Sequence, residues 1–222
     1  MVLFALPDTA LLYPSGTEVY MTTRIILVRH GQTESNKTGF YMGHSNEDMN
    51  ETGYSQVQCL SSKLAELPIA SIYTSPLRRT LSTASVIARP HKLEPVPVNG
   101  LIENYPGDWQ GLHKDEIIRK WPELCQQWLT DPTAVTLPNG EKFEEVVERA
   151  IRAFDLILEG NEGKHAIIVT HEIIVKVLVI HALGAPSSIY RRFDINNASN
   201  STMRITGNRI NIETLNDTSH LR

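Results

Sequence analysis

The sequence has 222 residues, of which 41% are hydrophobic and 21% are charged. This length and composition suit one α/β domain with a sizeable core and exclude a disordered, collagen-like or coiled-coil chain. The 25 acidic and 21 basic side chains give a formal net charge of -4. Because a broad nucleic-acid surface usually needs a basic excess, we expect no nucleic-acid partner.

Two further features bear on the compartment. No stretch approaches the roughly 18 consecutive apolar residues that span a bilayer, so we expect no membrane partner. The two cysteines, Cys59 and Cys125, are far apart and match no metal-ligand spacing. We interpret them as free thiols in a reducing compartment, which favours a cytoplasmic location.

The first twenty residues differ from the rest of the sequence. They are apolar in part, but Pro7 and Pro14 interrupt the apolar run, and no lysine or arginine precedes Arg24. A signal peptide combines positive charge with a continuous apolar segment, so we do not expect one here. We interpret residues 1–20 as a flexible leader, with an arm that packs on a partner subunit as the alternative. The folded domain is then expected over residues 21–222.

The first predicted elements alternate between strand and helix. Residues 25–28 are a continuous apolar run of β-formers, which predicts a strand buried on both faces of a parallel sheet. Apolar residues at helical spacing predict a helix over roughly 51–66, and a short strand follows at 72–74. The next helix begins near Leu77, and we expect it to stop before Pro90, because proline disfavours a helical conformation of the preceding residue.

The alternation continues in the second half. We expect further strands at 96–98 and 166–169, helices at 143–158 and 173–183, and a closing hairpin at 202–214.

This order of elements predicts the fold class. Alternating strands and helices imply an α/β three-layer sandwich, in which a mostly parallel central sheet has helices on both faces. Residues 106–140 are richer in Gly, Pro and Trp, and we expect them to form an insertion over one end of the sheet. Ligands of such sheets bind beyond the carboxyl ends of the strands. The segments after Val28, Thr74 and Val169 are therefore the candidates for a functional site.

Arginines and histidines follow these three strands. A single histidine at a strand end is more often structural, but two histidines together with two or three arginines at three strand ends favour a binding site. Arginine matches phosphate oxygens two at a time, and a neutral imidazole is a good nucleophile near neutral pH. Helix starts after the histidines would add backbone N–H donors. The groups are Arg29 and His30 after the first strand, Arg78 and Arg79 after the second, and His171 after the fourth.

Five segments, in order, resemble the signature of the histidine phosphatase superfamily, the phosphoglycerate mutase-like proteins. The resemblance covers about residues 24–221 and implies a histidine phosphatase domain. The segments are Arg29-His30-Gly31 with Thr33 and Asn36, Ser75-Pro76-Leu77-Arg78-Arg79-Thr80, Leu101-Ile102-Glu103 with Gly107-Asp108-Trp109-Gln110-Gly111, Val169-Thr170-His171, and Asn216-Asp217-Thr218-Ser219-His220-Leu221.

The resemblance implies a two-step displacement on a phosphate monoester. His30 would attack phosphorus to give a phosphohistidine, and Glu103 would protonate the leaving oxygen. The groups that would hold the phosphoryl oxygens are Arg29, Arg79, Asn36 and His171. Further candidates for substrate binding are Thr33, Gln32, Glu172, Tyr105 and His220. We expect no metal or other cofactor, because the arginines supply the positive charge that Mg²⁺ supplies elsewhere.

Several positions depart from the family pattern. Gln32 stands where glutamate is commoner, Ser35 where a bulky aromatic residue is common, and Met49-Asn50 where Pro-Leu-Thr is usual. Glu172 follows the second histidine, where glycine is typical. Its carboxylate either tunes the charge of the pocket or points to solvent.

The predicted function is a metal-independent phosphoric monoester hydrolase that acts on a small phosphorylated metabolite. The closing tail and the compact insertion resemble metal-independent phosphoserine phosphatases and α-ribazole phosphatases. The alternative is a phosphoglycerate mutase-type phosphotransferase, but the short segment between Glu103 and His171 favours hydrolysis. A non-catalytic binder of phosphorylated ligands would lack His30, Arg79 or Glu103, and all are present. The expected partner is the phosphorylated metabolite or inorganic phosphate, and the resemblance leaves a homodimer open.

Overall fold

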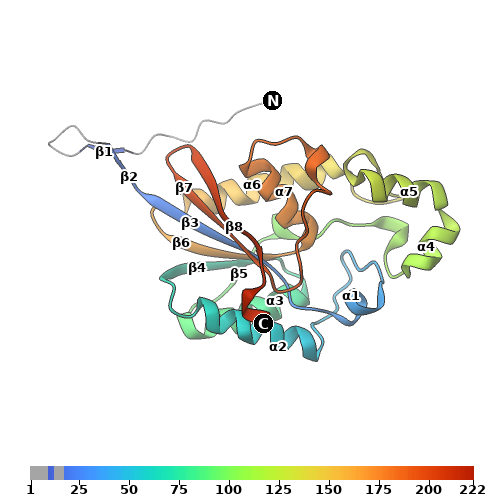
Figure 1. Cartoon of the computed structure of the whole chain (residues 1–222), viewed down its shortest axis with the longest axis horizontal. Helices are drawn as coiled ribbons and strands as arrows, with labels where there is room; N and C mark the ends of the chain where they lie inside the picture. The colour runs from blue at the N-terminus through green and yellow to red at the C-terminus, as the bar shows by residue number, and fades with distance from the viewer. Residues whose placement is uncertain (1–9, 13–17) are drawn as a thin grey trace.

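The computed structural model describes residues 10–12 and 18–222. At its centre lies a six-stranded sheet in the order β5-β4-β6-β3-β7-β8 (Figure 1). Strands β5, β4, β6 and β3 run parallel, and β7 and β8 are antiparallel additions at one edge. This confirms the mostly parallel sheet. The strands are β3 (Thr22–Arg29), β4 (Ile69–Thr74), β5 (Val96–Pro97), β6 (His165–Thr170), β7 (Asn200–Thr206) and β8 (Arg209–Asp217).

A separate two-stranded sheet pairs β1 (Ala10–Leu12) antiparallel with β2 (Glu18–Tyr20). The expected leader, residues 1–20, falls largely on residues outside the described ranges. Its flexibility and the start of the domain at residue 21 therefore stay predictions.

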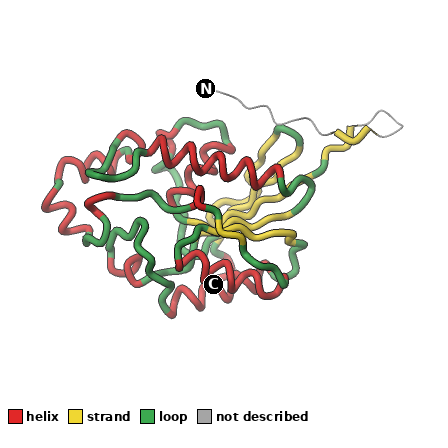
Figure 2. Tube along the Cα trace, turned by 180° about the vertical axis from the view of Figure 1, so that it is seen from behind, coloured by secondary structure: helices red, strands yellow, loops and turns green. Residues whose placement is uncertain are grey.

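Helices cover both faces of the central sheet (Figure 2). Successive side chains of a strand point to opposite faces. On β3, Ile25 and Leu27 pack in one core with α6 and α7, while Ile26 and Val28 pack in the other with α2 and α3. The three-layer arrangement is thus confirmed. The helices are α1 (Glu34–Thr38), α2 (Glu51–Leu64), α3 (Arg78–His91), α4 (Lys114–Lys120), α5 (Pro122–Thr130), α6 (Phe143–Glu159) and α7 (Glu172–Ala182).

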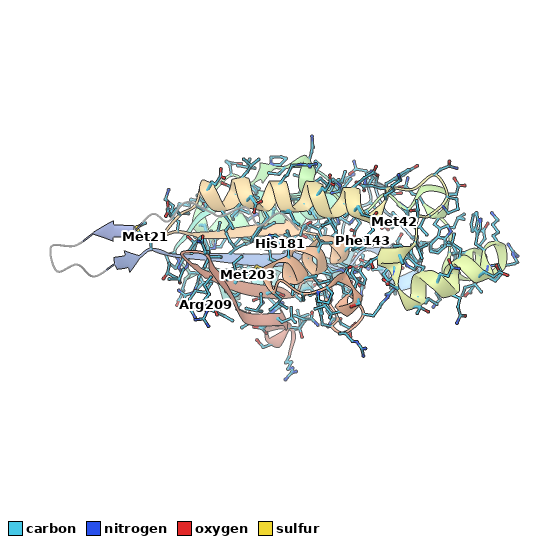
Figure 3. All side chains as sticks on the ribbon, turned by 90° about the horizontal axis from the view of Figure 1, so that it is seen from above. Met21, Met42, Phe143, His181, Met203 and Arg209 are labelled. Atoms are coloured by element: carbon cyan, nitrogen blue, oxygen red, sulfur yellow. The ribbon has the colours of Figure 1, made fainter. Side chains whose placement is uncertain are left out.

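The insertion at residues 106–140 lies beyond one end of the sheet (Figure 1). It consists of the 3-10 turns η2 (Gly107–Trp109) and η3 (Pro132–Ala134) with α4 and α5 between them. Trp109 is fully buried at its centre and meets the Trp128 ring edge-on, with 5.9 Å between ring centroids. Figure 3 places Met42 at the insertion end of the sheet and Met21 at the opposite end.

The structure contains no helix in residues 10–12 and 18–222 that is both long enough and apolar enough to cross a membrane.

Helix α3 continues further than the sequence predicts. Pro90 lies in its last turn, so the expectation that the helix stops before this residue is wrong. Pro90 has no N–H to donate to the carbonyl of Val86, four residues earlier. The hydroxyl of Ser61 on α2 donates to that carbonyl instead, at 3.1 Å. A tertiary hydrogen bond therefore replaces the missing one, and the helix ends at His91, followed by Lys92, whose φ of 55° is left-handed.

We expect Ser61→Ala to leave the buried Val86 carbonyl without this donor and to lower the free energy of unfolding by about 1–3 kcal/mol. Ser62→Ala is the matched control, because this hydroxyl is exposed and bonds within its own helix to the Gln58 carbonyl at 3.1 Å. Its effect should stay within about 0.5 kcal/mol. Urea unfolding of both variants measures the difference, and equal losses would contradict the role of Ser61.

Candidate active site

A cleft with a volume of about 480 Å³ opens between the insertion and the ends of the parallel strands. Because β6 lies between β4 and β3, the segments that follow these three strands meet at one edge of the sheet. Arg29, His30 and Arg79 line the cleft from the sheet side, together with Glu103 and Glu172. This is the edge at which the sequence predicts a site.

His30 follows β3 and is buried. Its Nδ1 lies 2.8 Å from the Gly31 carbonyl, which can only accept a hydrogen bond, so the proton is on Nδ1 and the lone pair is on Nε2. The Nε–H of Arg79 donates to Nε2 at 3.2 Å. Burial and the charges of Arg79 and Arg29 hold the pKa of His30 well below its usual value. The imidazole is therefore neutral and fixed in the tautomer that a nucleophilic Nε2 needs.

Arg79 is held in place by backbone carbonyls. It lies in the first turn of α3 and is buried. Its Nη1 donates to the Ser45 carbonyl and its Nη2 to the Gly43 carbonyl, both at 2.8 Å. Burial lowers the pKa of Arg79 to about 10, so the guanidinium still carries its charge near neutral pH. The loop before α2 thus holds the charged guanidinium of Arg79 against His30.

Arg29 supplies a second cation from the end of β3. Its Nη1 donates to the Ile195 carbonyl and forms an ion pair with Glu172 at 2.9 Å. Its Nε is buried and has no hydrogen-bond partner among the described residues. Since buried donors are rarely left unpaired, this nitrogen is suited to an anionic ligand.

His171 caps α7 and lies directly against His30, with 5.3 Å between ring centroids. It is fully buried, and its Nε2 lies 2.8 Å from the Ser75 hydroxyl. Burial and the charge of Arg79 hold the pKa of His171 well below its usual value. With Ser75 donating to Nε2, the proton of the neutral ring is on Nδ1, which has no partner among the described residues. That N–H can donate to a phosphoryl oxygen.

Glu103 lies on the loop after the 3-10 turn η1 (Asn99–Leu101). Its Oε1 accepts a hydrogen bond from the backbone N–H of Asn104 at 3.0 Å. Burial raises the pKa of Glu103, although this N–H and the Arg79 charge oppose the shift. A carboxyl with a raised pKa that borders the cleft is suited to act as a general acid.

Arg149 on α6 anchors the Glu103 loop. Its guanidinium donates to the carbonyls of Ile102 at 2.6 Å and Glu103 at 3.1 Å, and it pairs with Glu141 at 2.7 Å. His44 Nε2 also lies 2.7 Å from the Glu103 carbonyl. These contacts fix the backbone from which the acid projects.

Two of the expected binding residues organise the start of α1. The Thr33 hydroxyl accepts from the Asn36 N–H at 3.2 Å, and Asn36 Oδ1 accepts from the Thr33 N–H at 3.2 Å, which makes a capping box. Asn36 Oδ1 also accepts from Asn197 Nδ2 at 3.0 Å. Both residues line the cleft, and because Asn36 Oδ1 already accepts two hydrogen bonds, its amide Nδ2 is the group that can donate to a ligand.

Three other expected binding residues lie outside this lining. The Gln32 side chain accepts from Asn50 at 3.1 Å. Tyr105 is exposed and stacks obliquely on His44, with 5.2 Å between ring centroids. His220 lies in the terminal 3-10 turn η5 (Ser219–Leu221), where Figure 1 shows the chain end near α2. Their roles in substrate binding stay predictions.

From the sequence alone, no role is assigned to three residues that support the site: Ser75 against His171, Arg149 under the Glu103 loop, and Lys176 beside Glu172. Ser75 directly follows a predicted strand, and this position at the carboxyl end of the strand could have indicated that it lies near the site. Lys176 is an isolated charge in an apolar helix, four residues after Glu172, which is the spacing of a helical ion pair. Arg149 lies on the polar side of a long helix and gives no local signal.

Comparison with known proteins gives concordant matches. The model of the histidine phosphatase superfamily (branch 1) matches residues 25–218. The bifunctional protein Rv2228c of Mycobacterium tuberculosis is 39% identical over 178 residues, which are 80% of this chain and 49% of that protein. This chain thus spans about half the length of that relative.

Two other matches extend over nearly full lengths. Phosphoserine phosphatase 1 of Hydrogenobacter thermophilus is 31% identical over 198 residues, which are 89% of this chain and 94% of that protein. The solved structure of Bacillus stearothermophilus YhfR superposes with a TM-score of 0.86 at 27% identity and covers 90% of this chain and 100% of that one. This chain belongs to the histidine phosphatase superfamily, branch 1.

Proposed function

We propose that this chain hydrolyses phosphate monoesters of a small metabolite through a phosphohistidine intermediate. The observation that carries the proposal is the neutral His30 imidazole, whose Nδ1 is engaged by the Gly31 carbonyl while its Nε2 faces the cation of Arg79. A carboxyl with a raised pKa, Glu103, borders the same cleft, and a second buried imidazole, His171, lies against His30.

In the first step, Nε2 of His30 forms a bond to phosphorus as the ester P–O bond breaks. Glu103 transfers its proton to the departing alkoxide oxygen and is left as a carboxylate. Arg29, Arg79 and His171 donate to the three remaining phosphoryl oxygens and offset the charge that develops there. Because these donors are held by the protein before the reaction, little reorganisation is needed.

In the second step, water replaces the imidazole at phosphorus. The Glu103 carboxylate accepts a proton from the attacking water, the N–P bond breaks, and inorganic phosphate is formed. His30 is again neutral with its lone pair on Nε2, and Glu103 is again protonated, so the cycle closes. The positive charge at phosphorus comes from guanidinium groups, which supports turnover without a metal ion.

The relatives and the closing tail of the sequence support a proposal for the substrate class. We propose phosphoserine or a similar small anionic ester such as α-ribazole phosphate, supported by the similarity to Phosphoserine phosphatase 1 and by the closing tail of the sequence. A mutase-type phosphotransfer is distinguished by whether a catalytic amount of bisphosphoglycerate is required for turnover. A cytoplasmic location completes the proposal.

His30→Ala should lower kcat on an aryl phosphate by at least about a thousandfold while the protein stays folded, because the nucleophile is lost. His181→Ala, which removes an exposed imidazole at the end of α7, is the control and should keep wild-type turnover. Wild-type activity should survive a chelator. Acid quenching during turnover should trap an acid-labile phosphoenzyme in wild type but not in His30→Ala. Absence of any trapped species in both wild type and Glu103→Ala would count against a covalent intermediate.

The pH dependence should follow Glu103. His30 has a lowered pKa and stays neutral as the pH falls below the usual range for histidine, so it sets no acid limb there. Glu103 has a raised pKa and must be protonated in the first step, so kcat/KM should fall as the pH rises through that pKa. A profile from about pH 4 to about pH 9 measures the fall.

Glu103→Gln should remove this alkaline limb and should depend on the leaving group. An alkyl phosphate needs the proton, so we expect kcat/KM to fall by about 10²–10⁴-fold for this substrate. A nitrophenyl phosphate, whose leaving group is stable as an anion, should lose at least about tenfold less. Equal losses on the two substrates would rule out Glu103 as the general acid.

A further inference from the structure

A buried lysine lies beside the site and takes no part in the mechanism above. Lys176 on α7 is 2% exposed. Its ammonium lies 4.7 Å from the centroid of the Tyr190 ring and 5.8 Å from that of Phe193. It also pairs with Glu172, one helical turn earlier, at 3.3 Å. Burial of a cation without a counter-charge is unfavourable for folding. Glu172 and the two aromatic rings therefore stabilise the charged ammonium of Lys176 at this position.

Glu172 joins this lysine to the phosphoryl site. Its Oε1 faces Lys176, while its Oε2 lies 2.9 Å from Nη1 of Arg29. Its side chain is 35% exposed and lines the cleft. The three side chains form one ion-pair network with a formal charge of +1, so an arginine of the site is already paired with a carboxylate of the protein.

A phosphate dianion that binds the Nε of Arg29 therefore approaches the like charge of Glu172, which is already paired with Nη1 of the same guanidinium. Two unit charges a few ångströms apart near a protein surface interact by several kcal/mol before screening, which is large enough to change affinity. The ammonium of Lys176 offsets part of this repulsion and holds the carboxylate from its other side. Its removal would leave the full negative charge of Glu172 to act on Arg29 and on the phosphate.

We propose that Glu172 is a positioning residue that weakens the hold of the site on inorganic phosphate, and that Lys176 limits the strength of this effect. The inference rests on the proposed phosphatase function. Weak binding of the product is useful there, because interactions that bind ground state and product tightly do not accelerate the chemical step. The side chains of Arg79 and His171 form hydrogen bonds with Ser45, Gly43 and Ser75 and not with Glu172. Their remaining N–H groups can therefore bind the transferring phosphoryl group.

A different reading of Glu172 is that it binds an ammonium group of the substrate. Both of its oxygens already face a cation, and the network as a whole is positive. A substrate ammonium would meet net repulsion at this place, so the geometry favours control of phosphate affinity over recognition of an amine.

The test compares two neutralising substitutions with opposite expected signs. Glu172→Gln should lower the dissociation constant of inorganic phosphate by about tenfold, because the competing charge is removed. Lys176→Met keeps the apolar volume but removes the ammonium, and should raise that constant by roughly threefold or more. The double variant removes a neutral pair and should lie between the two single variants. Titration calorimetry with phosphate measures the constants, and competitive inhibition of turnover by phosphate should change in parallel.

Glu148→Gln is the matched control. Glu148 also pairs with a cation one helical turn away, Arg152 at 3.5 Å, but on the exposed side of α6. We expect no change in phosphate affinity. Thermal unfolding shows whether each variant is folded, and if Glu172→Gln is not, Lys176→Met and the double variant carry the comparison.

Two outcomes would overturn the inference. If Glu172→Gln and Lys176→Met both weaken phosphate binding, the network is merely structural. If wild type binds phosphate and turns over substrate while Glu172→Gln leaves the dissociation constant unchanged, the inference fails and the proposed function stands. If wild type neither binds phosphate nor hydrolyses any phosphate ester, the proposed function fails and the inference falls with it.

Discussion

The site depends on the contact between one buried guanidinium and one buried imidazole. Arg79 donates to Nε2 of His30 at 3.2 Å, so a proton on that nitrogen would bring two cations together. Burial lowers the pKa of Arg79 only to about 10, so the guanidinium keeps its own charge while its Nη1 and Nη2 donate to the Ser45 and Gly43 carbonyls. The imidazole is thus the partner that gives up its charge. The site makes the His30 imidazole nucleophilic by lowering its pKa, not by placing a general base beside it. Burial strengthens this lowering of the pKa.

The parallel sheet is what allows three distant segments to meet around this contact. Strand β6 lies between β4 and β3, so His171 at its end lies between the segments that carry Arg79 and His30. The central strands β3 and β6 each have a continuous buried apolar run, which leaves the carboxyl end as the first place beyond that run where polar side chains are tolerated. The insertion then closes the cleft from the other side and has its own core around Trp109, so it can differ in shape without disturbing the strands.

This division explains what the sequence can predict. His30, Arg79 and His171 directly follow short strands, and the strand pattern is local, so their convergence could be anticipated from strand ends alone. Arg149 could not, because its contact with the Glu103 carbonyl joins residues 46 positions apart and depends on how α6 is docked. The extension of α3 through Pro90 was missed for the same reason: the rule about proline is local, whereas the hydroxyl that relieves it belongs to Ser61 on another helix. The sequence pattern therefore predicts the helices and strands, but not the contacts between them.

The two carboxylates of the cleft show how surroundings separate chemically identical groups. For Glu103, burial outweighs both the hydrogen bond from the Asn104 N–H and the nearby cations, so its pKa is raised and it can carry a proton to a leaving group. Glu172 has a cation on each oxygen, from Arg29 and from Lys176, and balances charge instead. If their surroundings were exchanged, the proton donor would be lost and an unpaired buried charge would remain beside the phosphate. The proton transfer therefore depends on which of the two carboxylates is paired with cations, and not only on the presence of two carboxylates.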